Sequence, residues 1–521
     1  MYSSLEELTE DKIFSYCYSQ FVHPFSRYAD FTDLAKLNES SSKPLRKSMR
    51  VNTLKCSTEE FKNWAKSRGW MIEQVPWCRE GFYVDREDRS VALGKDLLHV
   101  LGYVYMQESA SMLPVSLLDP QPGDKVLDMS AAPGSKTTQI GARVKCGSAE
   151  VQSATSENKS GFVIANDVQE KRIWSLLSNL QRCGVVDSIV TRKVGQWFAN
   201  AMTEQFDRVL CDAPCTAQGT IRKDSDALTY CSLENTEKMA RLQVSLLESA
   251  IHACKVGGRI VYSTCTLTPE ENEGVVLSIL QKFPTHLRVV DPSEDVRHQT
   301  WDVRTAIQDS IKVQASLQKN FQLSTFNFPL LRLWPQTYDT EGFFSAVLEK
   351  TAPTKDSGQK EQEFHRFDLL PKSRVREVKE NLIDWYGTSF IRDDEVLLET
   401  KEQLLILPES ALHFPLPLKP YYSGMPFGKL TDHGLVRLSH EMATLRGHEA
   451  TKQILHLPES EMKKTLAGVS VTTSVEGFDD GDVLLGLEDN ALSRPMIFGR
   501  GLLKKGAILN RLPREIVRMF T

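Results

Sequence analysis

The sequence predicts an α/β fold in which a doubly wound, mainly parallel sheet is flanked by a smaller domain on each side. Between about residues 124 and 266, short apolar runs alternate with stretches of helical periodicity. Apolar runs of about four to eight residues separated by helices are typical of parallel strands buried on both faces. The chain has 521 residues, which at about 150 residues per domain allows three or four domains.

Five apolar runs supply the parallel strands in chain order. They are KVLDM, FVIAND, SIV, FDRVLCDAP and GGRIVYSTCT, which begin at Lys125, Phe162, Ser188, Phe206 and Gly257. The run FFSAVLEK, which begins at Phe343, predicts a final strand near one edge of the sheet. The Ser-rich stretch of residues 145–161 falls between the first two runs and predicts a surface loop.

Composition divides the chain into four parts. Residues 1–110 mix helical and strand-like patterns, and residues 111–350 contain the predicted sheet. Residues 351–363 have the polar composition of a linker. Residues 364–521 contain short β-like runs, including a hairpin pattern over 395–407, and we expect them to form a small β-rich module.

Composition also excludes several classes of protein. The 63 Lys and Arg and 68 Asp and Glu give a net charge of −5, which argues against a polyanion partner unless positive charge is clustered. No run approaches the roughly 18 apolar residues of a membrane span, and the acidic first residues lack the features of a targeting peptide. Ten cysteines without a CxxC pair indicate neither a disulfide scaffold nor a zinc site, so we expect a cytoplasmic protein without a metal.

Positive charge is concentrated in two places. The segment 43–55 has five basic residues and no acidic one, and the tail from residue 500 onward has six basic residues. Such runs usually form a solvated surface. The more specific interpretation is that they contact an RNA backbone. The residues on which that contact would depend are Lys43, Arg46, Lys47, Arg50, Lys504, Lys505 and Arg511.

A turn of small residues follows the first predicted strand. In the segment DMSAAPGSKT, Ala131, Ala132 and Gly134 let the backbone approach a ligand closely, and a helix with free amides begins after them. No GxGxxG or GxxxxGK[ST] pattern is present, which disfavours dinucleotide and nucleoside-triphosphate sites. Asp167 ends the next strand, where a carboxylate suits a ribose diol, so the pattern predicts a nucleoside cofactor. Arg172 either belongs to this site or faces solvent.

Two cysteines follow the last two parallel strands. Cys215 lies in CDAPCTAQGT and Cys265 in YSTCTLTPEENE, so both fall at strand ends, which form the ligand crevice of a doubly wound sheet. A single cysteine is usually a packing residue, but two in such loops indicate thiolate chemistry. Asp212 could serve a cofactor amine or hold a substrate base, and Lys136 could reach the crevice or coat its helix.

These motifs resemble the Sun-type (nucleolar-protein) family of RNA 5-methylcytosine methyltransferases. The matching segments are DMSAAPGSKT, ANDVQEKR, DAPCTAQGT and STCTLTPEENE, and a cysteine in each of the last two is highly specific to that family. The segments PLRKSMRVNTLK, VPWCREGFYVDR, YMQESASMLPV and EGFFSAVLEK look like one bacterial branch of it. The resemblance is dense over about residues 44–350 and thin beyond them.

The resemblance implies a Rossmann-like class I methyltransferase sheet that binds S-adenosylmethionine. It also implies an N-terminal α+β RNA-binding domain over residues 1–110 and a PUA-like RNA-binding extension over residues 364–521. The cofactor would lie on the small-residue turn, with Asp167 at its ribose. The implied cofactor residues are Ala131, Ala132, Pro133, Gly134, Ser135, Lys136, Thr137, Asp167, Arg172 and Asp212.

The resemblance further implies a covalent mechanism on 16S rRNA. Cys265 would attack C6 of a cytosine, Asp212 would hydrogen-bond the ring at N3, and Cys215 would help to remove the C5 proton. Lys136 would assist in binding the base. The base must leave any stack to reach the thiol. The implied partner is RNA within a 30S particle, bound by a monomer with no membrane contact.

Two positions depart from the family pattern, and two alternative functions stay open. Val194 replaces the acid that usually contacts the adenine after the third strand, and Asp187 precedes that strand. The segment CTAQG stands where CSGxG is common, although Thr216 and Ala217 are small. The alternatives are tRNA as substrate by the same chemistry, and a non-catalytic RNA-binding ribosome-assembly protein on the same fold.

Overall fold

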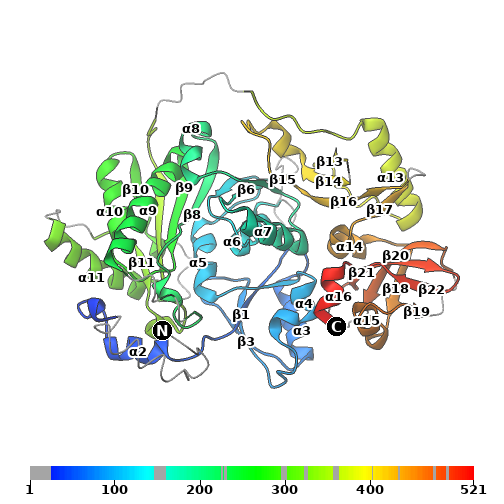
Figure 1. The fold of residues 1–521 in the computed structure, drawn as a ribbon, viewed down its shortest axis with the longest axis horizontal. Helices are drawn as coiled ribbons and strands as arrows, with labels where there is room; N and C mark the ends of the chain where they lie inside the picture. The colour runs from blue at the N-terminus through cyan, green and yellow to red at the C-terminus, as the bar shows by residue number, and fades with distance from the viewer. Residues whose placement is uncertain are drawn as a thin grey trace, which may run out of the picture.

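The computed structural model describes most of the chain (Figure 1). The described residues are 25–145, 160–224, 227, 232–294, 302–321, 327–355, 363–401, 403–431, 435–472, 477–487 and 492–520. The loop expected over 145–161 and the linker expected over 351–363 fall largely outside these ranges. In the view of Figure 1, the central sheet occupies the left and middle, and the C-terminal elements lie on the right.

A nine-stranded sheet forms the centre of the molecule. Its strands are β5 (Lys125–Asp128), β6 (Phe162–Asn166), β7 (Ser188–Thr191), β8 (Phe206–Asp212), β9 (Cys254–Thr264), β10 (Leu287–Val289), β11 (Leu331–Leu333), β12 (Phe343–Lys350) and β15 (Tyr422–Ser423). The order is β10-β12-β9-β8-β5-β6-β7-β15, with β11 beside β12, and β5 to β9 run parallel. The chain reverses its direction across the sheet between β5 and β8, so a ligand crevice is expected at the carboxyl ends there. The five predicted parallel strands and the FFSAVLEK strand are confirmed.

Helices cover both faces of this sheet. One face is covered by α5 (Ser109–Leu118), α6 (Ser135–Val144), α7 (Glu170–Cys183) and α11 (Val303–Phe321), and the other by α8 (Phe198–Ala201), α9 (Leu233–Ala253) and α10 (Glu273–Lys282). Successive strand residues point to opposite faces. Val126 of β5 packs in the core beneath α5, and Leu127 packs in the core beneath α9. Burial on both faces explains why the strands are continuously apolar.

The N-terminal part is a small antiparallel sheet with helices beside it. Its elements are α2 (Leu34–Ser41), β1 (Ser48–Val51), α3 (Thr58–Ser67), β2 (Met71–Gln74), β3 (Gly81–Asp85), α4 (Leu97–Val100) and β4 (Val104–Met106). The strand order is β2-β3-β1-β4. A capping box begins α3: Glu60 N donates to Ser57 Oγ at 3.1 Å, and Ser57 N donates to the Glu60 carboxylate at 2.8 Å. This exchange satisfies two free amides of the first turn.

The C-terminal part is β-rich, as expected, and contains two sheets of order β13-β14-β16-β17 and β18-β20-β21-β22-β19. The strands are β13 (Glu395–Glu399), β14 (Leu404–Pro408), β16 (Met425–Leu430), β17 (Val436–Leu438), β18 (Ile454–Leu457), β19 (Val471–Thr472), β20 (Gly481–Leu487), β21 (Met496–Lys504) and β22 (Ala507–Asn510). The helices are α13 (Lys372–Tyr386), α14 (His440–Arg446), α15 (Glu459–Leu466) and α16 (Arg514–Phe520). The hairpin pattern over 395–407 corresponds to the antiparallel pair β13 and β14.

The three parts share hydrophobic cores. Strand β15 belongs to the C-terminal part, yet it pairs with β7 and extends the central sheet. From the same part, the Phe414 ring lies 5.1 Å from the Phe162 ring and 5.6 Å from the Phe206 ring, between centroids. The N-terminal sheet and the last sheet also share one core, in which Phe82 and Phe498 are both buried. The division of the sequence at residue 363 therefore cuts through packed contacts.

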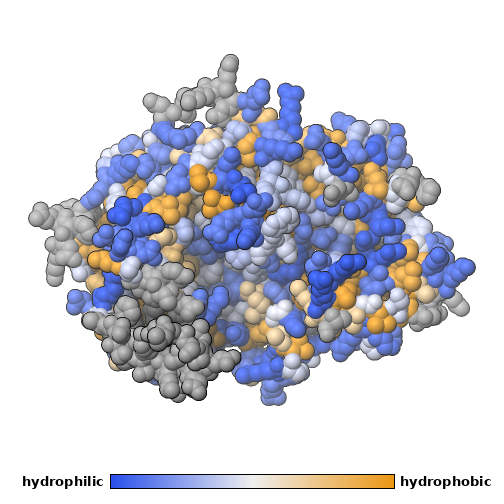
Figure 2. All heavy atoms as spheres, in the orientation of Figure 1, coloured by the Kyte–Doolittle hydropathy of each residue, from blue (hydrophilic) through white to orange (hydrophobic). Residues whose placement is uncertain are grey.

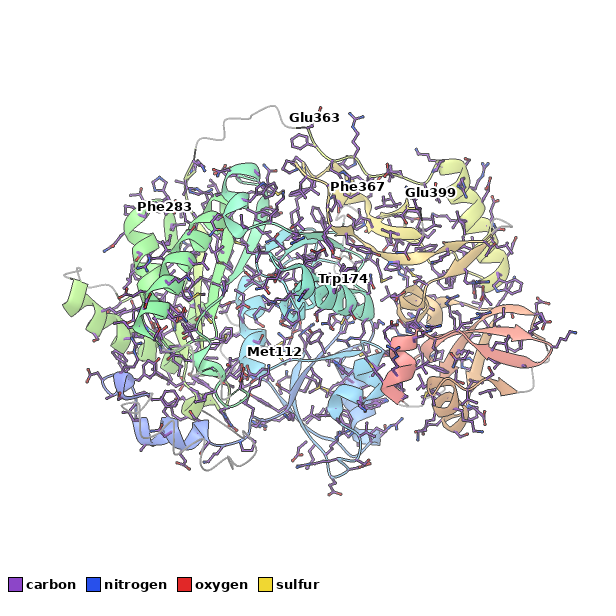
Figure 3. The ribbon with its side chains drawn as sticks, viewed as in Figure 1. Met112, Trp174, Phe283, Glu363, Phe367 and Glu399 are labelled. Atoms are coloured by element: carbon purple, nitrogen blue, oxygen red, sulfur yellow. The ribbon has the colours of Figure 1, made fainter. Side chains whose placement is uncertain are left out.

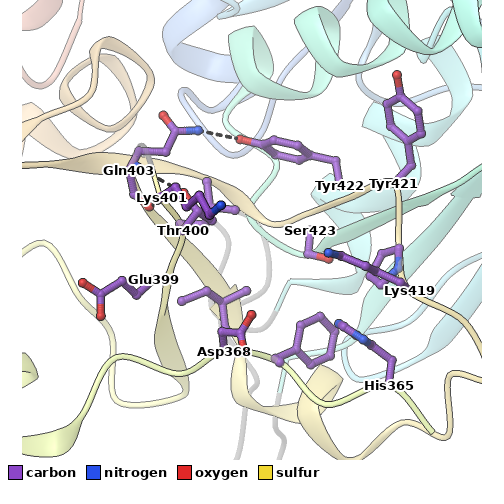
Figure 4. Close-up of a pocket in the computed structure, with 14 residues that line it drawn as sticks. His365, Asp368, Glu399, Thr400, Lys401, Gln403, Lys419, Tyr421, Tyr422 and Ser423 are labelled. Atoms are coloured by element: carbon purple, nitrogen blue, oxygen red, sulfur yellow. Dashed lines mark hydrogen bonds between the residues drawn. The ribbon is translucent and has the colours of Figure 1, made fainter. Parts of the chain in front are cut away.

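A cavity of about 390 Å³ lies where β15 meets the β13–β14 hairpin (Figure 4). On its wall, Gln403 Nε2 donates to Tyr422 Oη at 3.3 Å. Strand β15 stands five positions from β9 in the sheet, which is about 24 Å at about 4.8 Å per strand. The cavity is therefore remote from the strand ends that carry Cys215 and Cys265.

Two features are absent from the part of the chain that the structure describes. None of its helices is long and apolar enough to cross a membrane. Within the same residues, no three His, Cys, Asp or Glu side chains are grouped so that they could hold a metal ion.

Replacing Phe414 by Ala should destabilise the whole molecule rather than the C-terminal part alone. Loss of a buried aromatic ring typically costs about 3–5 kcal/mol, and this ring packs against the starts of β6 and β8. We expect one cooperative transition at a lower temperature in calorimetry. The control is Phe364→Ala, whose side chain is 52% exposed and whose loss should change little. An additional early transition beside an unchanged main one would contradict the shared core.

Candidate active site

The turn after β5 has a backbone shape that favours small residues. Gly134 has a φ of +110°, which only glycine adopts freely, and a Cβ there would lie 3.1 Å from Leu176 Cδ1. The peptide bond between Ala132 and Pro133 is cis. Helix α6 begins directly after the glycine, and no side chain caps its first amides. The predicted strand, turn and helix are thus present, with free amides at the helix start.

Asn166, the last residue of β6, fastens three loops at the carboxyl edge. Its Nδ2 donates to Met129 O at 3.1 Å and to Lys193 O at 2.9 Å. Its Oδ1 accepts from Lys193 N at 2.9 Å and from Thr191 Oγ1 at 3.0 Å. In addition, Ala131 N donates to Asn166 O at 2.8 Å. One amide side chain therefore joins the loops after β5, β6 and β7 into a single rim.

Asp167 and Arg172 meet beside the small-residue turn. Asp167 is 2% exposed, and its Oδ1 accepts from Gln169 N at 2.9 Å. Its buried Oδ2 accepts no hydrogen bond from the described residues, although Arg172 Nη1 lies 3.4 Å away. Arg172 Nη2 donates to Ala132 O, so this side chain belongs to the site. An open, buried carboxylate oxygen next to a close-approach turn fits the ribose of a nucleoside cofactor.

Thr137 stabilises the turn from behind. It is fully buried, and its hydroxyl donates to Asp128 Oδ2 at 2.7 Å and lies 3.3 Å from Ala131 O. Burial, with a contribution from the charge of Asp212, raises the pKa of Asp128 to about 7. Thr137 therefore stabilises the conformation of the turn.

The end of β7 lacks the carboxylate that the resemblance predicts. Val194 follows this strand and is 56% exposed. Asp187 is buried at the opposite end of β7, where its carboxylate lies 3.4 Å from Lys145 Nζ, so it cannot substitute. On α7, Trp174, which Figure 3 labels, is 63% exposed, and its ring lies 6.5 Å from the ring of Tyr421. Apolar and aromatic groups are therefore available on this side of the rim.

The two predicted thiols lie next to each other. Cys215 Sγ and Cys265 Sγ are 3.4 Å apart, and both cysteines are free and partly buried. The hydrogen bond with Cys265 and burial are the main causes that raise the pKa of the Cys215 thiol well above its usual value. Cys215 is therefore protonated at neutral pH.

Two glycines allow the cysteine loops to approach one another. Gly219 N donates to Cys265 O at 2.9 Å, and Gly342 N donates to Gly219 O at 2.9 Å. A Cβ on Gly219 would lie only 2.1 Å from Gly342 O. Ala217, in contrast, has a φ of +56° in the left-handed region, where the family pattern has glycine.

The buried carboxylate of Glu271 ties the two cysteine loops together. It accepts hydrogen bonds from Thr216 N at 3.0 Å, Thr216 Oγ1 at 2.5 Å and Thr268 Oγ1 at 2.7 Å. It also accepts from Gln243 Nε2 of α9 at 2.8 Å. Thr216 follows Cys215 directly, and Thr268 belongs to the loop of Cys265. The carboxylate therefore sets the distance between the loops.

Lys136 and Asp212 form an ion pair in the crevice. Lys136 Nζ lies 2.7 Å from Asp212 Oδ2 and donates to Ser111 Oγ at 3.1 Å. Asp212 Oδ1 accepts from Ser263 Oγ at 2.7 Å. Burial is the largest single influence and lowers the pKa of Lys136, but the charge and hydrogen bond of Asp212, with smaller contributions from Cys265 and Asp128, together raise that pKa above its usual value. The ammonium group stays charged and reaches the crevice rather than coating its helix.

Arg222 holds the N-terminal part against the crevice. Its guanidinium donates to Lys43 O at 3.0 Å and to Pro44 O at 2.9 Å. It also donates to Thr340 O at 3.1 Å and pairs with Asp339 at 2.7 Å. The basic segment that begins at residue 43 therefore runs along the rim of the Cys215 loop.

The prediction that Arg50 contacts RNA is wrong. Its side chain is buried, with the residue 2% exposed. Its Nε donates to Gln107 Oε1 at 2.9 Å, and its Nη2 donates to Thr138 Oγ1 at 2.8 Å and to Ser135 O at 3.3 Å. A buried guanidinium that joins β1 to α6 stabilises the interface between these elements instead.

The other predicted RNA contacts are exposed. They are Lys43, Arg46, Lys47, Lys504, Lys505 and Arg511. Lys43 pairs with Glu39 at 2.7 Å and Arg46 with Glu73 at 2.5 Å, so part of their charge is neutralised locally. Figure 2 shows hydrophilic residues over much of the face in view, with hydrophobic residues between them in smaller groups. Exposure leaves these six residues available to a polyanion.

The structure brings the predicted catalytic and cofactor residues to one edge of the sheet, whereas the predicted RNA contacts are spread over two parts of the chain. Sequence reasoning missed four residues that organise the site. Asn166 and Glu271 lie inside the motifs that signalled the site, so their position could have indicated a role. Ser111 lies in the segment YMQESASMLPV, whose resemblance implied no role for it, and Arg222 carries no local signal, because its partners are distant in sequence.

Two family models match the chain. The model of the 16S rRNA methyltransferase RsmB/F family matches residues 115–349, and that of the N-terminal domain of 16S rRNA methyltransferase RsmF matches residues 19–109. Together they span the N-terminal part and the central sheet.

Curated relatives and one solved structure extend this similarity. The chain is 34% identical over 490 residues to ribosomal RNA small subunit methyltransferase F of Aeromonas salmonicida, with 92% of each chain covered. It is 33% identical over 492 residues to the protein of the same name from Psychromonas ingrahamii, with 91% of this chain and 92% of that one covered. The crystal structure of a methyltransferase homolog protein from Pyrococcus horikoshii is 29% identical, with a TM-score of 0.52, and the match covers 66% of this chain and 100% of that one.

Replacing Glu271 by Gln should loosen the two cysteine loops. In the variant, an NH₂ group replaces one of the two carboxylate oxygens, and an NH₂ group cannot accept a hydrogen bond. At least one of the buried hydrogen bonds to residue 271 is therefore lost. We expect the free energy of unfolding to fall by about 1–3 kcal/mol, as measured by urea denaturation. The neighbouring variant Glu270→Gln is the control, since Glu270 makes a partly exposed ion pair with Arg27, with side chains 30% and 32% exposed. Equal stability of the two variants would contradict the role of Glu271.

Proposed function

The chain belongs to the RsmB/F family of 16S rRNA methyltransferases, and from this premise we propose that it methylates C5 of a cytosine in 16S rRNA. It is an rRNA methyltransferase that uses S-adenosylmethionine. The proposal concerns the base, the atom and the covalent route. One observation carries it: the thiols of Cys215 and Cys265 lie 3.4 Å apart at the carboxyl edge of the sheet. An ion pair of Lys136 and Asp212 stands in the same crevice.

The cofactor residues proposed here fit S-adenosylmethionine. The open oxygen of Asp167 would accept from a ribose hydroxyl, and the free amides at the start of α6 would lie under the close-approach turn. Arg172 keeps Asp167 in place from the solvent side. When bound there, the cofactor supplies an activated methyl group. Val194 would give the adenine an apolar contact in place of a carboxylate.

Cys265 is the proposed nucleophile because C5 of a neutral cytosine reacts poorly with an alkylating group. Its thiolate forms a bond to C6, and the π electrons of the C5–C6 bond move to C5, which then takes the methyl group. Negative charge develops on the ring during attack. The ammonium group of Lys136 is placed to donate to the ring and offset that charge, and Asp212 would accept a hydrogen bond from N3 once that nitrogen is protonated. Afterwards the C5 proton leaves, the sulfur–C6 bond breaks and the double bond returns.

Cys215 is the proposed acceptor of the C5 proton. Its contact with Cys265 explains when in the reaction it becomes a base. Its pKa is raised chiefly through Cys265, by hydrogen bonding and by charge. Once Cys265 is bonded to carbon, its sulfur carries no charge, and that cause disappears. The pKa of Cys215 then falls, so its thiol can lose its own proton to water, and the resulting thiolate takes the proton from C5. The second thiol therefore becomes a base only after the first has reacted.

RNA would reach this crevice along the N-terminal and C-terminal parts, for which we propose RNA binding over residues 1–110 and 364–521. The target base must be unpaired or flipped to enter a crevice between strand ends. We further propose that the enzyme acts as a monomer on a 30S particle. The exposed lysines and arginines of both parts supply the positive charge for phosphate contacts.

The two cysteines should give opposite phenotypes. Cys265→Ala should abolish methylation, because no bond to C6 can form. Cys215→Ala should leave a covalent enzyme–RNA adduct, visible as a slowly migrating band on a denaturing gel. Cys254→Ala is the control, since Cys254 is buried at the far end of β9 and should leave methylation intact. Methylation by the Cys265→Ala variant would refute the covalent route.

Bisulfite sequencing of total RNA should identify the substrate. A deletion strain should lose protection of one cytosine in 16S rRNA, and the wild-type gene should restore it. Loss of a protected cytosine in tRNA would instead establish the tRNA alternative. An unchanged pattern in both RNAs would favour a non-catalytic role in ribosome assembly.

A further inference from the structure

Two acidic residues, Glu108 and Glu341, lie beside the crevice and have no part in the mechanism above. Glu341 follows α12 (Pro335–Tyr338) and precedes β12, and Glu108 caps the start of α5. Glu341 N lies 3.4 Å from Glu108 Oε1. Glu341 is 5% exposed, and its buried Oε1 accepts no hydrogen bond from the described residues. A buried acceptor without a donor is unfavourable unless a ligand or a proton satisfies it.

Backbone hydrogen bonds connect the loop of Glu341 to the loops that carry Cys215 and Cys265. Gly342, the next residue, donates to Gly219 O, and Gly219 N donates to Cys265 O, each at 2.9 Å. In the neighbouring strands, Phe344 pairs with Thr264, the residue before Cys265. The loop that carries Glu341 is therefore held against the loop that carries the nucleophile.

Hydrogen bonds also connect Glu108 to the ion pair of Lys136 and Asp212. Ser109 Oγ donates to Glu108 Oε1 at 2.9 Å, and Ser111 N donates to Glu108 Oε2 at 3.2 Å. The hydroxyl of Ser111 accepts from Lys136 Nζ, which pairs with Asp212. Both oxygens of Asp212 are already in use, one by Lys136 and one by Ser263. Glu341 thus offers a further carboxylate oxygen that accepts no hydrogen bond from the described residues.

The charges around Glu341 allow it to change protonation near neutral pH. Burial and the charge of Glu108 raise the pKa of Glu341 to about 7, against the opposing charges of Lys223, Lys136 and Arg222. Burial also raises the pKa of Glu108. The carboxyl group of Glu341 can therefore lose its proton near neutral pH and act as an acceptor.

We propose that Glu341 reads the exocyclic amine of the target base and so selects cytosine over uracil, with Glu108 as its positioning partner. The proposal rests on the proposed function, since it names a contact of the same base. Cytosine presents a donor at position 4, and an ionised Glu341 accepts from it. Uracil presents a carbonyl at that position, which would leave two acceptors facing each other. Sites that bind through a buried polar group discriminate strongly in this way.

The test compares two RNAs with wild-type and Glu341→Gln enzymes. Each RNA is the 16S fragment around the bisulfite-mapped position, with 5-fluorocytosine or 5-fluorouracil at the target, because fluorine at C5 traps the covalent adduct. For Glu341→Gln, we expect the ratio of adduct rates, cytosine over uracil, to fall about tenfold or more. The control Asp339→Asn, on the same loop and half exposed, should keep the wild-type ratio. A wild-type ratio in Glu341→Gln would overturn the proposal.

A pH profile tests the proposal without relying on one variant. As pH rises through about 7, Glu341 loses its proton and its ability to donate to uracil, so the wild-type preference for cytosine should increase. Glu108→Gln removes the neighbouring charge that raises the pKa of Glu341, so its profile should shift to lower pH while the preference remains. A flat wild-type profile would overturn the proposal. Absence of any wild-type adduct with the 5-fluorocytosine RNA would instead refute the proposed function itself.

Discussion

The active site depends on one buried carboxylate with its donors. Glu271 is fully buried, and in such a place a carboxylate is tolerated only when hydrogen bonds satisfy it. Its donors come from the loop after β8, the loop after β9 and helix α9. Satisfying the carboxylate therefore fixes the distance between the two loops. The short separation of Cys215 and Cys265 follows from this requirement, since two thiols attract each other only weakly.

The same edge of the sheet is braced from outside by both flanking parts. Arg222 links the Cys215 loop to the N-terminal segment at residue 43, and Arg50 links β1 to the start of α6. On the other side, β15 pairs with β7. The N-terminal sheet and the last C-terminal sheet share a core, so the two flanking parts contact each other as well as the catalytic sheet. We call this ring of contacts the closed circuit. Loops that carry reactive groups are normally mobile, and this circuit restrains them.

Local patterns in the sequence were sufficient to predict the strands and the thiols. A buried parallel strand needs only a short apolar run, and both cysteines stand directly after such runs. Burial of a charged residue has no such signal: Arg50 lies in a basic run that reads as surface, yet three acceptors from distant segments surround it. Strand β15 has two residues, too few for any periodicity, and exists because the edge of β7 is available. The hydrogen-bond partners of Glu271 could not be predicted from the sequence either, because tertiary packing determines them.

The closed circuit also bears on the RNA contacts that we propose for a chain with a net charge of −5. A flexible basic tail would bind any phosphate backbone within reach, and its affinity would depend mainly on charge. Here the exposed cations sit on parts that are packed to each other and to the catalytic sheet, so their distances from the thiols are set in advance. Only an RNA whose phosphates match those distances gains the full attraction, because groups that are already ordered lose little entropy on binding. Selectivity then follows from the rigid placement of a few charges, and a higher positive charge would weaken it.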